Sequence, residues 1–266
     1  MTIESVVADL RALGLKEGSR VVVHASLRSI GPVEEGALGV VRALREVVGD
    51  GGLVLLPSFN HGVPFVRGAV GLFDPRSTKS ENGALSDTFW REPGVHRSHH
   101  PTHPFAAWGE GAEEIVRGHD LTLTIGPDSP LGRLHRQGGH LLHLGTSHEV
   151  STAKHLAETL AHAPCLGYAG DAFSVLLPSG ELVKRSPWRY RARPCPLTDE
   201  GKHIERRLEE RGVERTAPVG YATGRLSPLV DFVREVLGLL REGAPGAPAC
   251  RACTIPPGRA EGDWEC

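Results

Sequence analysis

The stretch that decides the fold runs from residue 19 to residue 59 and reads SRVVVHASLRSIGPVEEGALGVVRALREVVGDGGLVLLPSF. Two continuous apolar runs, at 21–23 and 53–56, flank a segment whose apolar side chains recur at helical spacing. Continuous apolar runs are typical of strands buried on both faces, and the spacing between them is typical of an amphipathic helix. The order strand, helix, strand predicts a βαβ unit in a covered, parallel arrangement.

The rest of the chain supplies further elements of the same kind. Residues 138–145, GGHLLHLG, are expected to form a third buried strand, and residues 173–190 a hairpin that turns on Pro178-Ser179-Gly180. Helices are expected within residues 2–15 (with Thr2 as the cap), 35–49, 83–91, 199–212 and 227–243. The predicted fold is α/β, with a mixed, largely parallel central sheet flanked by helices and a smaller second lobe that includes the hairpin.

Composition narrows the class of protein. The 266 residues carry a formal net charge of −2 and 39% hydrophobic residues, which gives no electrostatic footprint for nucleic acid. No apolar run reaches the roughly 18 residues of a membrane span, and the amphipathic first segment does not resemble a signal peptide. Five cysteines, an odd number, argue against a fully paired secreted framework. We expect a cytoplasmic protein without a nucleic-acid or membrane partner, as a monomer or a homodimer.

One helical stretch, STAKHLAETLAHAP at residues 151–164, carries candidate catalytic groups. Thr152, His155 and Glu158 follow one another at intervals of three, so neighbours in the series share a face. They come just after a predicted strand ends, where open α/β sheets place ligands. A histidine oriented by a carboxylate suits a general base, but the spacing alone equally fits a solvated Glu–His pair worth about 0.2–0.5 kcal/mol.

Two other polar segments have both functional and ordinary interpretations. The turn HASLRSIG at residues 24–31 could bind an anion or a cofactor at a helix start, or could be an ordinary turn between a strand and a helix. The loop VHRSHHPTHPFAAWG at residues 95–109 holds four histidines. A metal cluster is one interpretation, but no Asp, Glu or Cys completes a ligand set nearby, so imidazoles that hydrogen-bond locally or line a cleft are favoured.

Taken together, these segments resemble the aminoglycoside 3-N-acetyltransferase family. The resemblance is carried, in chain order, by seven segments: HASLRSIG, GGLVLLPSF, GALSDTFWR, RSHHPTHP, DSPLGRLHRQGGHLLHLG, STAKHLAE and VGYATGRLSPLVDF. They extend from about residue 20 to residue 232.

The resemblance implies an enzyme that transfers acetyl directly from acetyl-CoA to an amine of an aminoglycoside antibiotic. It implies that His155 is the general base, that Glu158 orients His155, and that Thr152 hydrogen-bonds near the thioester. It also implies a coenzyme site made by eight residues: Ser26, Leu27, Arg28, Ser29, Ile30, Gly31, Arg97 and Ser98.

The sequence departs from the family pattern at several positions. Ser151 stands where the family has asparagine, and Pro104 stands where it has serine. Around the site, the expected substrate contacts are Glu149, Asp87 and His103, and acidic residues to attract a polycation are otherwise few. The resemblance therefore supports acyl-CoA chemistry more strongly than a particular antibiotic. A different amine substrate, or a catalytically inactive zinc-stabilised binding module, remains an alternative.

The C-terminal segment holds a cysteine pattern outside the family resemblance. Residues 1–242 are expected to form the acetyltransferase domain, and residues 243–266 a tail with Cys250 and Cys253 in a CxxC arrangement followed by Cys266. Two thiolates on one tight turn suit zinc, and Cys195 is the best candidate for a fourth ligand. A zinc clasp and free thiols on a loose tail both stay open.

Overall fold

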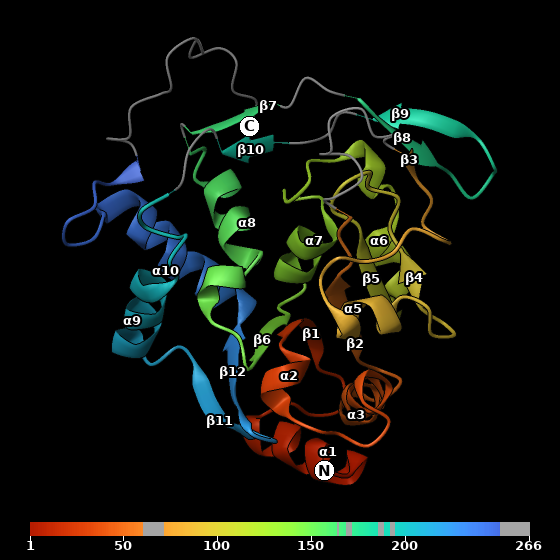
Figure 1. The fold of residues 1–266 in the computed structure, drawn as a ribbon. Helices are drawn as coiled ribbons and strands as arrows, with labels where there is room; N and C mark the ends of the chain where they lie inside the picture. Colours follow the sequence, from red (N-terminus) through yellow and green to blue (C-terminus); the bar gives the residue numbers. More distant parts are fainter. Residues whose placement is uncertain (61–71, 164, 169–171, 186–188, 192–194, 251–266) are drawn as a thin grey trace.

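The computed structural model describes residues 1–60, 72–163, 165–168, 172–185, 189–191 and 195–250. Its centre is a seven-stranded sheet in the order β11-β12-β6-β1-β2-β5-β4 (Figure 1). The strands are β1 (Arg20–Ala25), β2 (Leu53–Pro57), β4 (His96–Arg97), β5 (Phe105–Gly109), β6 (His140–Leu144), β11 (Arg215–Val219) and β12 (Ala222–Pro228).

The predicted mixed sheet flanked by helices is confirmed, with its parallel part confined to the centre. β1 pairs in parallel with β2 and with β6, whereas β12, β11, β5 and β4 add antiparallel pairs outside them. The βαβ connection through α3 (Ala37–Val48) makes the first pair parallel, because a crossover helix returns the chain to the same end of the sheet. β11 and β12 are antiparallel because they form a hairpin around Gly220 and Tyr221.

Helices cover both faces of the sheet. Alternate side chains of β1 point to opposite faces, so Val22 joins one apolar cluster while Val21 and Val23 join the other. The cluster with Val22 is completed by α6 (Ala112–Val116), α7 (Pro130–Arg136), α8 (Ala153–Leu160), α9 (Lys202–Arg211) and α10 (Leu229–Glu242). The other cluster is completed by α1 (Ile3–Leu13), α3 and α5 (Ala84–Phe89). Thr2 caps α1 as predicted, because its side chain accepts from the amide of Ser5.

Smaller elements lie beside the main sheet. β8 (Phe173–Leu176) and β9 (Leu182–Arg185) form the predicted hairpin, and β3 (Leu72–Phe73) pairs with β8 in a three-stranded sheet. A two-stranded sheet joins β7 (Leu166–Tyr168) to β10 (Arg189–Arg191). Both small sheets lie at the top of Figure 1, at the end of the molecule opposite α1. Short helical turns complete the chain: α2 (Leu27–Ile30), η1 (His119–Leu121) and η2 (His148–Val150).

Gly145, which ends β6, lies closely against the helical turn α2. Its φ is +66°, and a Cβ placed there would lie 2.5 Å from the Cβ of Ser29 and 3.0 Å from that of Ala222. Gly138 has a similar φ of +69° but open space around it. A substitution at either position has to adopt a left-handed backbone, but only a substitution at position 145 also crowds its neighbours.

We expect Gly145→Ala to lower the free energy of unfolding more than Gly138→Ala does. The left-handed conformation costs each alanine variant about 1–2 kcal/mol, and overpacking adds about 1–3 kcal/mol at position 145 alone. Urea unfolding of the two variants measures the difference. Equal losses would show that α2 moves freely away from the end of β6.

Candidate active site

The predicted catalytic pair is in contact at the start of α8. Nδ1 of His155 lies 2.9 Å from Oε2 of Glu158, and the His155 side chain is 38% exposed while that of Glu158 is 1% exposed. The other carboxylate oxygen of Glu158 accepts a 2.7 Å hydrogen bond from the hydroxyl of Thr198. An ionised Glu158 can only accept at Nδ1 of His155, so this contact favours the neutral tautomer with its proton on Nδ1 and with Nε2 able to accept a proton.

Thr198 was missed at the sequence level, since it lies 40 residues beyond Glu158 in an irregular segment. Lys154 ties this segment to the loop before α8, because its amine donates to the carbonyl oxygens of Glu149 at 2.5 Å and of Thr198 at 3.2 Å. The Lys154 amine also lies 3.9 Å from the carboxylate of Asp199. Residues 195–200 are therefore held against α8 through both Glu158 and Lys154.

Thr152, the third residue of the predicted series, contacts a histidine of the central sheet. It occupies the position before α8, and its hydroxyl lies 3.1 Å from Nε2 of His24, whose ring is in β1. Burial is the main cause that lowers the pKa of His24 from 6.5 to about 3, so the ring is neutral. Electrostatic interactions with His148 and Lys154 lower the pKa of His24 further. His24 thus positions Thr152 at the carboxyl end of β1.

A row of polar side chains crosses the sheet at this level. His24 on β1 is paired in register with His143 on β6, and His143 with Arg225 on β12. The rings of His24 and His143 stack with centroids 5.2 Å apart. This row was not identified in the sequence, although a histidine inside the apolar run of residues 141–144 is the signal that points to it. It lies on the sheet face that α8 and α10 cover.

The segment after β1, predicted as a turn that leads into a helix, contains the short helix α2. Ser26 caps α2 by accepting from the amide of Ser29 at 3.3 Å, and its hydroxyl also accepts from the hydroxyl of Ser29 at 2.8 Å. Arg28 is exposed and Leu27 is half-buried. Ile30, by contrast, is fully buried, and Gly31 contacts the ring of Tyr221 so closely that a Cβ would lie 2.5 Å away. The polar side chains of this turn face outward near Gly145.

Arg97 and Ser98, predicted to hold the coenzyme, have buried side chains with partners inside the protein. The guanidinium of Arg97 donates to the carbonyl oxygens of Thr78 (2.5 Å) and Ser58 (2.9 Å), and lies 4.4 Å from the Trp90 ring centre. Burial lowers the pKa of Arg97 to about 9. Ser98 is 0% exposed, and its hydroxyl accepts from the amide of Phe105. Their burial conflicts with a direct contact to coenzyme.

The predicted substrate contacts are spread over different elements. Glu149 is exposed in η2, directly before α8. The carboxylate of Asp87 accepts from the amide of Ser80 at 2.9 Å, from the indole of Trp90 at 3.1 Å and from Arg91 at 2.9 Å. Among these candidates, Glu149 keeps an exposed carboxylate beside the catalytic helix.

The histidine-rich loop forms a buried hydrogen-bond network, as the non-metal interpretation favoured. Nδ1 of His119 lies 2.9 Å from the hydroxyl of Ser98, and its Nε2 lies 3.0 Å from the carbonyl oxygen of Thr124. Nδ1 of His100 accepts from the amide of His103 at 3.0 Å, and the ring of His103 lies 2.8 Å from the hydroxyl of Thr102 and packs on Phe59. The Ser98–His119 pair has the contacts of an activated serine, but both side chains are fully buried.

Burial of this network predicts acid sensitivity. Desolvation lowers the pKa of His119 from 6.5 to about 3, so between about pH 6.5 and pH 3 the unfolded chain binds one more proton here than the folded chain. Stability therefore falls as pH falls through this window, by about 1.4 kcal/mol per pH unit for this residue. In urea titrations at pH 6 and pH 5, His119→Asn should reduce that slope. An unchanged slope would show that His119 is not a cause of the acid sensitivity.

The structure describes two of the four cysteines that were candidates for zinc ligands. Cys195 is half-buried and packs against the core cluster that contains Cys250. Cys253 and Cys266 lie outside the described residues. The predicted clasp therefore stays a prediction.

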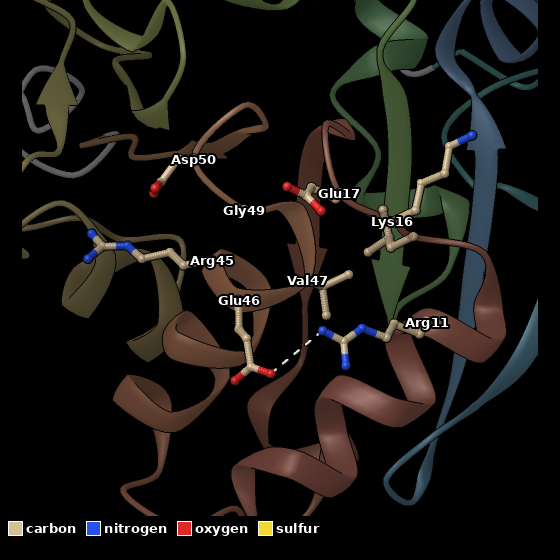
Figure 2. A pocket seen from close by; sticks show the side chains of 9 residues that line it. Arg11, Lys16, Glu17, Arg45, Glu46, Val47, Gly49 and Asp50 are labelled. Carbon is tan, nitrogen blue, oxygen red and sulfur yellow. Dashed lines mark ion pairs between the residues drawn. The ribbon is translucent and has the colours of Figure 1, made fainter.

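A hollow of about 650 Å³ lies between α1 and α3, far from the catalytic pair (Figure 2). Its lining includes Lys16 and Glu17, which precede β1, and Asp50, which precedes β2. It is therefore at the amino ends of the parallel strands, whereas His155 follows the carboxyl end of β6. Its charged groups have mixed sign, and Arg11 and Glu46 already form an ion pair across it at 3.7 Å.

The fold and this geometry define a class of protein: an α/β protein with a partly exposed histidine, held by a buried carboxylate, at the carboxyl edge of its sheet. The sequence model of the aminoglycoside 3-N-acetyltransferase family matches residues 22–241. The chain belongs to this family.

Named members of this family are similar to the chain in both sequence and structure. Aminoglycoside N(3)-acetyltransferase IV of Salmonella sp is 35% identical over 241 residues, covering 88% of this chain and 85% of that protein. A crystal structure of a histidine-to-alanine variant of aminoglycoside acetyltransferase AAC(3)-IVa in complex with a gentamicin superposes with a TM-score of 0.77 at 33% identity, covering 94% of this chain and 95% of the other. AAC-IIIb in a binary complex with CoASH gives a TM-score of 0.81 at 27% identity, with coverages of 91% and 97%.

In the described part of the chain, no helix has both the length and the hydropathy required to cross a bilayer.

Proposed function

We propose that this protein transfers the acetyl group of acetyl-CoA to the 3-amino group of an aminoglycoside, with His155 as general base. The observation that carries the proposal is the hydrogen-bonded series His155–Glu158–Thr198, which leaves Nε2 of the exposed imidazole free to accept a proton. The names of the relatives support the substrate class, and the CoASH complex of AAC-IIIb supports the donor.

In the proposed reaction, the amine nitrogen attacks the thioester carbonyl carbon, and Nε2 of His155 takes the proton that the amine loses. Collapse of the tetrahedral intermediate breaks the carbon–sulfur bond, and the coenzyme leaves as a thiolate that accepts a proton. Glu158 stabilises the imidazolium that forms, because its buried carboxylate faces Nδ1. General-base catalysis of this kind contributes typically about 10²–10⁴-fold.

We assign the coenzyme to the turn of Ser26, Arg28 and Ser29, and we leave out Arg97 and Ser98 because they are buried. This turn lies against Gly145, which starts the segment leading to α8, so a thioester bound there would be near the base. Glu149 is the proposed contact for a substrate ammonium group, since its carboxylate is exposed directly before the catalytic helix.

The proposal is tested by measuring CoA thiol release with a panel of amines. Gentamicin and apramycin are expected to release thiol in proportion to added enzyme, whereas glucosamine is expected to give only the background rate. Release with glucosamine but with no aminoglycoside would contradict the substrate class. Absence of release with every amine, from a protein shown to be folded, would contradict the activity itself.

A further inference from the structure

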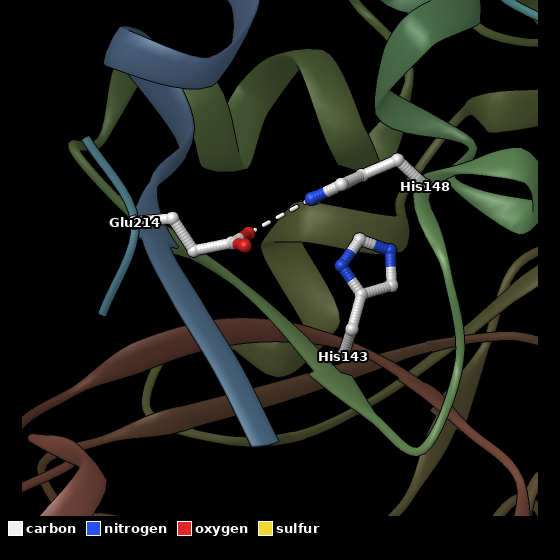
Figure 3. A group of neighbouring side chains, drawn as sticks. All are labelled: His143, His148 and Glu214. Carbon is white, nitrogen blue, oxygen red and sulfur yellow. Dashed lines mark ion pairs between the residues drawn. The ribbon is translucent and has the colours of Figure 1, made fainter. Parts of the chain in front are cut away.

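Three buried side chains outside the proposed catalytic pair converge behind the loop that precedes α8. His143 comes from β6, His148 from η2, and Glu214 from the segment before β11, and their polar ends point toward one another (Figure 3). One ligand atom from each lies within 4.8 Å of the other two. His143 and His148 are 0% exposed, and the Glu214 side chain is 7% exposed.

These side chains have few hydrogen bonds for groups so deeply buried. In the described part of the chain, neither nitrogen of His143 has a hydrogen-bond partner, and Nδ1 of His148 has none. Nε2 of His148 and Oε2 of Glu214 are 2.8 Å apart, but neither makes a well-directed hydrogen bond. Buried polar groups in folded proteins nearly always have a partner, so a group of unpartnered nitrogens calls for an explanation.

We propose that His143, His148 and Glu214 bind a divalent transition metal ion of the zinc class. Two imidazoles and one carboxylate are a ligand set that zinc uses widely, and imidazole favours Zn²⁺ over Mg²⁺ or Ca²⁺. Ligand atoms on a tetrahedral zinc are separated by about 3.3 Å, given bonds of about 2.0–2.1 Å. Since the three atoms lie within 4.8 Å of one another, the widest pair would have to contract by at most about 1.5 Å.

The surroundings hold the three ligands in place. Arg225 donates to the other carboxylate oxygen of Glu214 at 3.0 Å, which leaves Oε2 facing the histidines. The ring of Phe232 packs at 5.4 Å from that of His148, and the ring of His24 stacks on His143. Such outer contacts orient metal ligands in known sites. Since the three ligands are buried, the ion would hold β6, η2 and the start of β11 together rather than meet substrate.

Metal binding is tested on protein without a histidine tag, after EDTA treatment and dialysis. We expect one equivalent of zinc to bind, and the midpoint of thermal unfolding to rise by about 5–10 °C at zinc concentrations near 100 times the dissociation constant. Cobalt should bind with visible d–d bands and no near-ultraviolet thiolate band. Less than about a tenth of an equivalent, with no thermal shift, would overturn the proposal and leave a His148–Glu214 ion pair.

Two variants separate this site from the cysteine tail. His143→Leu gives up no hydrogen bond, so the metal-free protein should keep its stability while the zinc-dependent shift disappears. Glu214→Gln should keep the contact with Arg225 and weaken zinc binding by more than about 100-fold, since even an outer partner is worth 10–100-fold. Cys250→Ser is the matched control and should change nothing. Zinc retained by His143→Leu but lost by Cys250→Ser would place the ion on the tail instead.

Discussion

Replacing His155 by alanine is expected to lower kcat for acetyl transfer by about 10²–10⁴-fold, because the attacking amine then loses its proton to water alone. The His155 side chain is partly exposed and contacts Glu158 through one nitrogen, so its removal should leave the fold intact. KM for the amine should change little if the imidazole acts only in the transition state. Steady-state kinetics of the purified variant measure kcat and KM, and circular dichroism checks that the fold is intact.

The split between kcat and KM distinguishes a base from a binding contact. An unchanged kcat with a raised KM would show that His155 contributes to binding rather than to proton transfer.

The second large effect is expected for Glu158→Gln. The glutamine oxygen can still accept from Thr198, but its amide would donate to Nδ1 of His155 and move the ring proton to Nε2, the nitrogen that has to act as the base. The loss in kcat should lie between about 10-fold, typical for a lost orienting partner, and about 10⁴-fold, seen when a serine-protease triad adopts the wrong tautomer.

Thr198→Val is the matched control for Glu158→Gln. It removes one hydrogen bond to the same carboxylate at a cost of about 1 kcal/mol in stability, while the carboxylate and its contact with His155 remain. We expect a small change in kcat. Equal losses from both variants would mean that placement of the carboxylate, rather than its charge, controls the rate. In a double variant, the effects of His155→Ala and Glu158→Gln should not add, since both act on one proton transfer.

The parts of the fold with a strong local pattern could be predicted from the sequence. The βαβ unit of residues 19–59, the strand before Gly145 and the hairpin around Gly180 all follow from apolar runs and turn residues. The contact between His155 and Glu158 follows from helical spacing. In each case the decisive residues are close in sequence, so the local rules that fix them are visible in a single window.

Features that depend on distant residues could not be predicted in this way. Thr198 and Lys154 meet across a tertiary contact, and nothing in residues 195–200 indicates a role beside α8. Similarly, the polar row through His24, His143 and Arg225 depends on the order of strands in the sheet, which the hairpin of β11 and β12 completes. The burial of Arg97 and Ser98 also depends on tertiary packing, which the family motif does not reveal.

The buried position of Lys154 has a consequence for an enzyme that acetylates amines. Lys154, the residue before the proposed base His155, is itself a primary amine, and an unprotonated amine close to the bound thioester would compete with the substrate. Here the Lys154 nitrogen donates to two carbonyl oxygens and faces a carboxylate, and the residue is 4% exposed, so these contacts favour the ammonium form, which cannot attack a thioester. With the coenzyme bound at the proposed site, the contacts that hold residues 195–200 against α8 would also keep this amine from accepting the acetyl group.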